Sequence, residues 1–328
     1  MPGGLILLYH RVAEVQSDPW LLSVTPRHFA EHLEVLRKVG RPMRLRALAQ
    51  NLREGKSQYR PLVVTFDDGY ADNLYNAKPL LERYEISASI FLTTGCIGQD
   101  REFWWDELDR LLLQPSTLPS ALQLTVDGTT HDWDLGEAAD YGEDTAWHYG
   151  TWRAWDKHDP SARHSLYRSL YHLLHPLPAG EQRKVLEDLR AWASAEPASR
   201  PSYRPLTIEE ILTLAQGDLV EIGAHTITHP PLSARPTAIQ REEINQSKAY
   251  LEEILGSRVT TFAYPYGGKS AYNAETVALV REAGFACACS VSADVVRRGS
   301  DLFQLPRLHV QDWDGERFSQ VLSRWLDG

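Results

Sequence analysis

Short apolar segments alternate with segments of helical periodicity in both halves of this sequence, and this alternation constrains the fold more than any other feature. In the first half the apolar segments are residues 5–9, 62–66 and 88–93, and helices are predicted over about 26–39 and 77–84. Apolar strands separated by helices are typical of a parallel sheet or an α/β barrel. The first half therefore predicts an α/β fold.

The alternation stops between about residues 100 and 205. The predicted elements here are a hairpin around Asp127-Gly128 and two helices near 161–175 and 180–194. Seven of the ten tryptophans lie in this stretch, and no Gly/Ser-rich or Pro-rich linker isolates it. We interpret 100–205 as an insertion within one domain, 1–328, rather than as a second domain.

The alternation resumes after residue 205. Strands are predicted at about 219–224, 260–264, 286–290 and 305–310, with helices over about 237–255 and 274–283. Capping signals support two helix starts, one at the predicted helix 26–39 and one after Thr207. Thr25 precedes a proline at a first helical position, and Thr207 is followed three residues later by Glu210, as in a capping box.

Charge and hydropathy exclude some partners. The formal net charge is -10, without a basic run, which argues against a nucleic-acid partner. The apolar run at residues 4–9 is too short for a membrane span or a signal-peptide core. We therefore expect no transmembrane segment and a cytoplasmic location, unless an export signal lies outside this sequence. The oligomeric state is not predicted.

Two adjacent carboxylates, Asp67 and Asp68, directly follow the apolar strand at 62–66, and Gly69 comes next. In α/β barrels, residues at the carboxyl ends of strands face the site. Neighbouring carboxylates repel each other unless a cation or a proton relieves the repulsion. The pair therefore indicates a metal site, and the alternative is a solvated turn.

Two histidines follow another apolar strand. His225 and His229 are four residues apart, a spacing that allows two imidazoles to bind one metal ion, and the prolines after His229 favour a loop or a single turn. One carboxylate and two imidazoles form a three-ligand set that leaves an open position for an activated water. The second Asp could take the proton from that water.

Two later segments supply weaker candidates. Tyr264-Pro265-Tyr266-Gly267 ends a strand in a rigid turn, which could hold backbone N–H groups for an oxyanion or be a plain turn. Arg307 and His309 alternate with apolar residues and share one strand face. If that face points into the barrel mouth, His309 is a candidate general acid and Arg307 could pair with Asp67. The alternative is an edge strand with solvated side chains.

Taken in order, these motifs resemble the polysaccharide deacetylases of the NodB-homology type. The residues that carry the resemblance are Thr65-Phe66-Asp67-Asp68-Gly69, His225-Thr226-Ile227-Thr228-His229-Pro230 and Tyr264-Pro265-Tyr266-Gly267. The opening Leu8-Tyr9-His10-Arg11-Val12 is similar to the branch that includes exopolysaccharide N-deacetylases. The resemblance covers about residues 4–100 and 205–312.

The resemblance implies a distorted (β/α) barrel of about seven parallel strands. It implies Asp67 as catalytic base, the backbone N–H of Tyr266 as an oxyanion donor, and Asp68, His225 and His229 as metal ligands. The implied metal is zinc, with nickel, cobalt, iron and manganese as alternatives. Many members carry an arginine where this chain has Ala263, and Arg307 is our candidate to supply the missing charge.

The function predicted is metal-dependent removal of N-acetyl groups from an amino-sugar saccharide or glycoconjugate. The tryptophans of the insertion suit a sugar partner, although most of them are expected to fill a small core, with Trp104 and Trp105 as the exceptions. Two alternatives stay open: an amidohydrolase acting on a cyclic amide or imide, and a carbohydrate-binding relative without catalysis. The intact Asp-His-His set disfavours the first alternative, and Asp67 disfavours the second.

Overall fold

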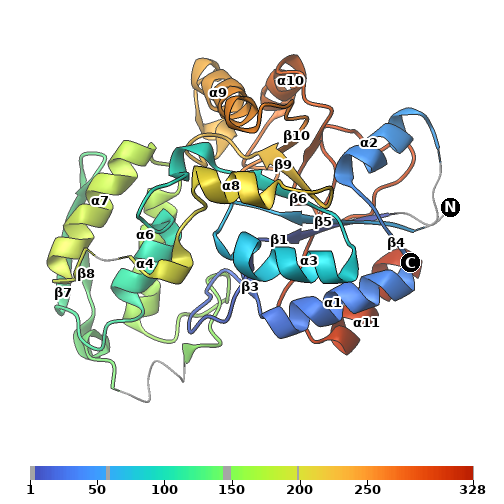
Figure 1. Cartoon of the computed structure of the whole chain (residues 1–328). Coiled ribbons are helices and arrows are strands. Elements are labelled where there is room, and N and C mark those ends of the chain that lie inside the picture. Colours follow the sequence, from blue (N-terminus) through green and yellow to red (C-terminus); the bar gives the residue numbers. More distant parts are fainter. Residues whose placement is uncertain (1–3, 57–59, 143–148, 198, 328) are drawn as a thin grey trace. The chain divides into compact units, whose positions relative to one another are not determined.

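A computed structural model describes residues 4–56, 60–142, 149–197 and 199–327 (Figure 1). The chain divides into two compact units. The first unit comprises Met1–Glu14, Leu22–Gln99 and Pro205–Gly328, and the second comprises Val15–Leu21 and Asp100–Arg204. Our interpretation of 1–328 as one domain with a 100–205 insertion stays a prediction.

The first unit is built on a curled parallel sheet, as the alternation predicted. In the described part of the chain, seven strands are hydrogen-bonded in the order β11-β10-β9-β6-β5-β1-β12, all parallel, with β4 beside β5. They are β1 (Leu5–Tyr9), β4 (Arg41–Pro42), β5 (Pro61–Phe66), β6 (Ala88–Leu92), β9 (Val220–Ala224), β10 (Thr261–Ala263), β11 (Cys287–Cys289) and β12 (Leu308–His309). A parallel bridge from Leu305 to Cys289 and the pairing of β12 with β1 curl this sheet into the predicted distorted barrel.

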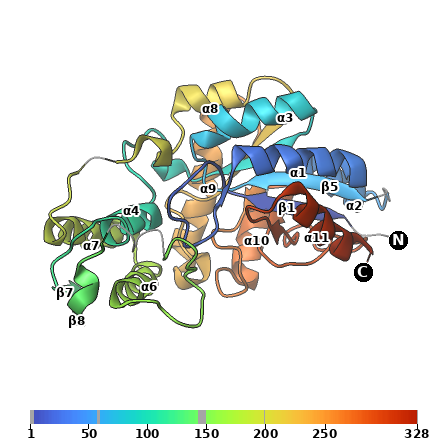
Figure 2. The same cartoon turned by 90° about the horizontal axis from the view of Figure 1, so that it is seen from below.

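Helices pack against one face of this sheet, as Figures 1 and 2 show. They are α1 (Pro26–Val39), α3 (Lys78–Tyr84), α8 (Ile208–Leu214), α9 (Thr237–Leu255), α10 (Ala274–Glu282) and α11 (Gly315–Asp327). Helix α2 (Leu45–Arg53) packs against side chains of the other face. Both capping signals are confirmed. Thr25 Oγ1 accepts from the His28 N–H, and Thr207 forms a capping box with Glu210. Helices α2 and α11 were not predicted.

Shorter elements complete the first unit. They are β2 (Arg11–Val12), β3 (Ser23–Val24), a π-helical turn at Asn73–Ala77 and 3-10 turns at Thr94–Cys96 and Leu232–Ala234. Across the described ranges, no helix combines the length and apolarity needed to cross a bilayer.

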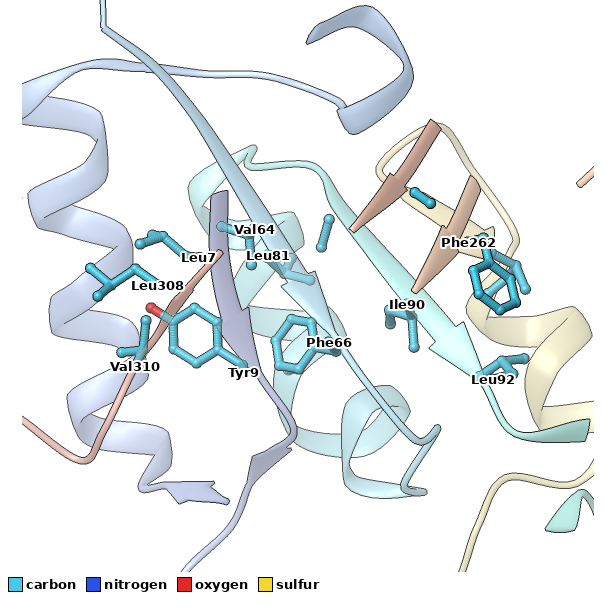
Figure 3. Close-up of a cluster of buried hydrophobic side chains, with 14 of the residues drawn as sticks. Leu7, Tyr9, Val64, Phe66, Leu81, Ile90, Leu92, Phe262, Leu308 and Val310 are labelled. Carbon is cyan, nitrogen blue, oxygen red and sulfur yellow. The ribbon is translucent and has the colours of Figure 1, made fainter. Parts of the chain in front are cut away.

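Alternation along the strands assigns side chains to the two faces of the sheet. Leu7, Tyr9, Val64 and Phe66 belong to the large core that the outer helices cover, as Figure 3 shows. Their neighbours point the other way, since successive side chains of a strand lie on opposite faces. These neighbours (Ile6, Val63, Phe91, Ala263) form a second core cluster with Leu45 and Leu48 of α2. Side chains an even number of residues further along each strand therefore continue this inner face.

The second unit contains the predicted hairpin and helices. Its elements are α4 (Trp104–Leu112), β7 (Ala121–Val126), β8 (Thr129–Asp134), α6 (Ala162–Leu174), α7 (Ala179–Trp192) and 3-10 turns at Gly136–Ala139 and Pro201–Tyr203. Trp104 packs on the core of this unit, and Trp105 is 5% exposed and stacks on Phe103 at 4.9 Å. Trp105 is therefore a core residue rather than the exception we expected, whereas Trp155 is 51% exposed.

His32 of α1 makes the stability of the first unit sensitive to acid. The imidazole is fully buried, Nε2 donates to the Trp313 carbonyl at 2.6 Å, and the ring stacks on Phe318. Burial lowers the pKa of His32 from 6.5 to about 4. Between these values the unfolded chain binds a proton that the folded chain does not. The stabilising contribution of neutral His32 is therefore fully present above pH 6.5, and the free energy of unfolding falls by about 3 kcal/mol as the pH drops to 4.

This loss is measurable by urea unfolding at several pH values between 7 and 4. His32→Gln, which cannot titrate, is expected to be less stable at pH 7 but to lose less stability on acidification than the parent protein. Parallel pH profiles for the two proteins would contradict the assignment.

Candidate active site

The two aspartates follow β5 at the carboxyl edge of the curled sheet. The Asp67 N–H extends the sheet by donating to the Tyr9 carbonyl at 3.0 Å, so its side chain continues the inner face. Asp68 and Gly69 then turn the chain with φ angles of 71° and 87°. Both aspartates are buried, with Asp67 3% and Asp68 4% exposed. The alternative of a solvated turn is therefore wrong.

Arg307 pairs with Asp67 through two parallel hydrogen bonds. Nη1 and Nη2 each donate to one carboxylate oxygen at 2.7 Å, and Nε donates to the Ser290 carbonyl. Arg307 is fully buried, so the solvated-edge alternative is wrong for this residue, and the predicted pairing is confirmed. Burial alone would raise the pKa of Asp67, but the charge of Arg307 and its hydrogen bonds outweigh burial and hold the pKa at about 2. Asp67 is thus an ionised carboxylate in a fixed orientation.

The histidines lie on the loop after β9, as predicted, rather than on a helix. His225 continues the inner face, and its N–H donates to the Leu92 carbonyl at 3.0 Å. Its Nδ1 lies 2.7 Å from the Ala263 carbonyl, which requires the proton on Nδ1 and leaves the Nε2 lone pair for a metal. Burial lowers the pKa of His225, which favours the neutral imidazole that metals bind.

The ligand atoms have the spacing of a metal site. One donor atom from each of Asp68, His225 and His229 lies within 4.8 Å of the others. Asp68 Oδ1 is 3.6 Å from His225 Nε2 and 3.4 Å from His229 Nε2. Ligands about 2.1 Å from a tetrahedral zinc ion lie roughly 3.4 Å apart. These three buried residues therefore fit a divalent cation in both donor chemistry and spacing.

Tyr266 lies in the loop that follows β10, and His309 is the last residue of β12. Tyr266 has a φ of 60°, and its ring meets the His229 ring at 4.6 Å. His309 pairs in register with Leu8 and is half-buried, with its ring edge-on to His10 at 5.4 Å. Their roles as oxyanion donor and general acid stay predictions, as do the catalytic roles of Asp67 and Arg307.

Two polar residues at strand ends were not assigned from the sequence. His10 follows β1 and Thr93 follows β6, both in positions that continue the inner face. His10 Nδ1 and Thr93 Oγ1 are buried and find no hydrogen-bond partner among the described residues. Burial lowers the pKa of His10 to about 3, so its ring is neutral. The signal was present, because each directly follows a buried strand, as the aspartates do.

Comparison with known proteins agrees with this geometry. The sequence profile of the family described as polysaccharide deacetylase matches residues 54–118 and 194–288, which hold both halves of the cluster. The Bacillus subtilis (strain 168) protein named "Putative polysaccharide deacetylase YxkH" is 27% identical over 139 residues, 41% of this chain and 48% of that protein. The match thus spans about half the length of this curated relative. The chain belongs to the polysaccharide deacetylase family.

Solved structures share the fold over their whole length. Streptococcus pyogenes deacetylase PplD, in complex with acetate, superposes with a TM-score of 0.59 at 16% identity, covering 100% of both chains. IcaB from Ammonifex degensii superposes with a TM-score of 0.60 at 19% identity, covering 100% of this chain and 98% of that one. At these identities the likeness shows a common fold.

Proposed function

We propose that this protein is a metal-dependent hydrolase that removes acetyl groups from the amino sugars of a saccharide or glycoconjugate. The observation that carries the proposal is the buried set of Asp68, His225 and His229 beside the Asp67–Arg307 pair. The set lies at the carboxyl edge of a parallel barrel, where such folds place their chemistry. Family membership supports an acetylated saccharide as the substrate.

The cation that we propose for the three ligands is zinc, with nickel, cobalt, iron and manganese as alternatives. When bound, a divalent cation would supply Lewis-acid polarisation of the acetyl carbonyl and a lowered pKa for water.

The remaining steps fall to side chains and backbone of this chain. Asp67 accepts the proton of the attacking water, and Arg307 holds its carboxylate in one orientation. The Tyr266 N–H donates to the oxyanion that develops on the acetyl oxygen. His309, on the strand beside β1, donates a proton to the departing amine. General-base catalysis requires a group that is placed before the substrate arrives, and the buried Asp67–Arg307 pair meets this requirement.

Acetate release from N-acetylglucosamine oligomers tests the proposal. We expect release by the purified chain, loss of release after dialysis against a chelator, and recovery when Zn²⁺ is added back. Parallel samples with the other four cations would identify the preferred metal. His225→Ala is the matched control, since metal addition should not restore it.

Three outcomes would contradict the proposal. Acetate release that persists after chelation would show that the reaction does not require a metal. Hydrolysis of small cyclic imides without acetate release would favour the other amidohydrolase. Saccharide binding without any release, with every cation tried, would favour a carbohydrate-binding protein that lacks catalysis.

A further inference from the structure

A third acidic residue holds the loop between the two histidines. Glu243 lies on α9 and is 7% exposed. Its Oε2 accepts from the N–H groups of Ile227 at 2.7 Å and Thr228 at 2.9 Å. Its Oε1 accepts from Thr228 Oγ1 at 2.5 Å. These three hydrogen bonds of the carboxylate therefore come from Ile227 and Thr228, two of the three residues that separate His225 from His229.

The backbone of this loop needs such a support. Thr226 and His229 have φ angles of 66° and 59°, in the left-handed region that favours glycine. A β-branched residue such as Thr226 is rarely stable there unless its surroundings enforce the conformation. Inside the loop, Thr226 Oγ1 accepts from the His229 N–H at 3.1 Å. The hydrogen bonds of Glu243 connect this turn to helix α9.

The role of Glu243 differs from that of the ligands. Its oxygens are occupied by three donors, and it is not a member of the Asp68, His225 and His229 set. Hydrogen bonds from N–H groups to a carboxylate are charge-assisted, hence short and directional. A rigid helix thereby fixes the path of the chain between the two imidazoles.

We propose that Glu243 is a positioning residue that sets the affinity of the site for a divalent cation, by holding His225 and His229 at one separation. The inference rests on the proposed metal-dependent function. Residues that orient metal ligands commonly contribute about 10- to 100-fold to metal affinity. Glu243→Gln keeps the size of the side chain but removes its charge, so the hydrogen bonds from Ile227 and Thr228 lose their charge assistance. It is therefore expected to weaken cation binding by about that factor.

The test measures the dissociation constants of Zn²⁺ and Co²⁺ alone, by competition with a chromophoric chelator, so that no substrate is needed. The Co²⁺ absorption spectrum reports the ligand geometry in the same samples. Glu242→Gln is the matched control, because Glu242 is the exposed neighbour of Glu243 on α9, and its Oε1 accepts a hydrogen bond from Gln246 Nε2 on the same helix. Thr228→Val removes one of the three hydrogen bonds and should give a smaller loss.

Weaker binding and an altered Co²⁺ spectrum in Glu243→Gln, with Glu242→Gln like the parent, would support the inference. Equal dissociation constants in the parent and Glu243→Gln would overturn it and leave the proposed function standing. Should Glu243→Gln fail to fold, unchanged binding in folded Thr228→Val would overturn the inference. A parent protein that binds neither cation would overturn the proposed metal dependence, and this inference with it.

Discussion

Asp67→Asn is expected to lower the turnover number for acetate release by about 100- to 10,000-fold, the range that general-base catalysis contributes. Asparagine has nearly the same shape as aspartate but cannot accept the proton of the attacking water. The residue is 3% exposed and held by Arg307, so bulk water gives little compensation. Steady-state kinetics on an N-acetylated oligomer, with the metal content measured in the same preparation, would provide the number.

Asp68→Asn is the informative partner for this experiment. Asp68 Oδ1 is 3.4 Å from His229 Nε2, in the position of a ligand, whereas Asp67 faces Arg307. Asp67→Asn should therefore retain its cation while losing turnover, and Asp68→Asn should lose both. Undiminished acetate release by Asp67→Asn would refute our choice of base.

Arg307→Ala is expected to lower turnover sharply and to destabilise the fold by about 3–5 kcal/mol, while a cation still binds. Removing one member of a buried ion pair leaves the other charge without compensation, which accounts for that cost. Asp67 would lose both of its 2.7 Å hydrogen bonds, and with them its orientation and the main influence that keeps its pKa low. Acetate-release kinetics, urea unfolding and metal content measure the three effects.

Arg307→Lys separates charge from geometry. Lysine restores a positive charge but cannot reproduce two parallel hydrogen bonds to one carboxylate. We expect it to recover part of the stability and little of the turnover. Unchanged turnover in Arg307→Ala would show that Arg307 does not replace the arginine that many family members carry at the position of Ala263.

Much of the fold could be predicted from local patterns. The strands β1, β5 and β6 are mainly apolar and are buried along their length, and the predicted caps at Thr25 and Thr207 form as expected. Helix α2 escaped prediction because it spans only nine residues and its N-cap, Arg44, makes no side-chain capping bond. Only the tertiary structure shows that its apolar residues pack against the inner face of the sheet.

The sequence by itself determined the chemistry of the candidate site: two carboxylates after one strand and two imidazoles after another. The surroundings of the two carboxylates could not be told apart locally, because Asp67 and Asp68 are adjacent and chemically identical. Tertiary structure places them differently, since strand alternation turns Asp67 toward Arg307, 240 residues away, and the following turn at φ 71° sends Asp68 toward the histidines. The contacts of Glu243 could not be predicted from the sequence either, because no local pattern shows which groups a glutamate on a helix will bond. Only the packing of α9 against the loop brings Glu243 to the backbone between the histidines.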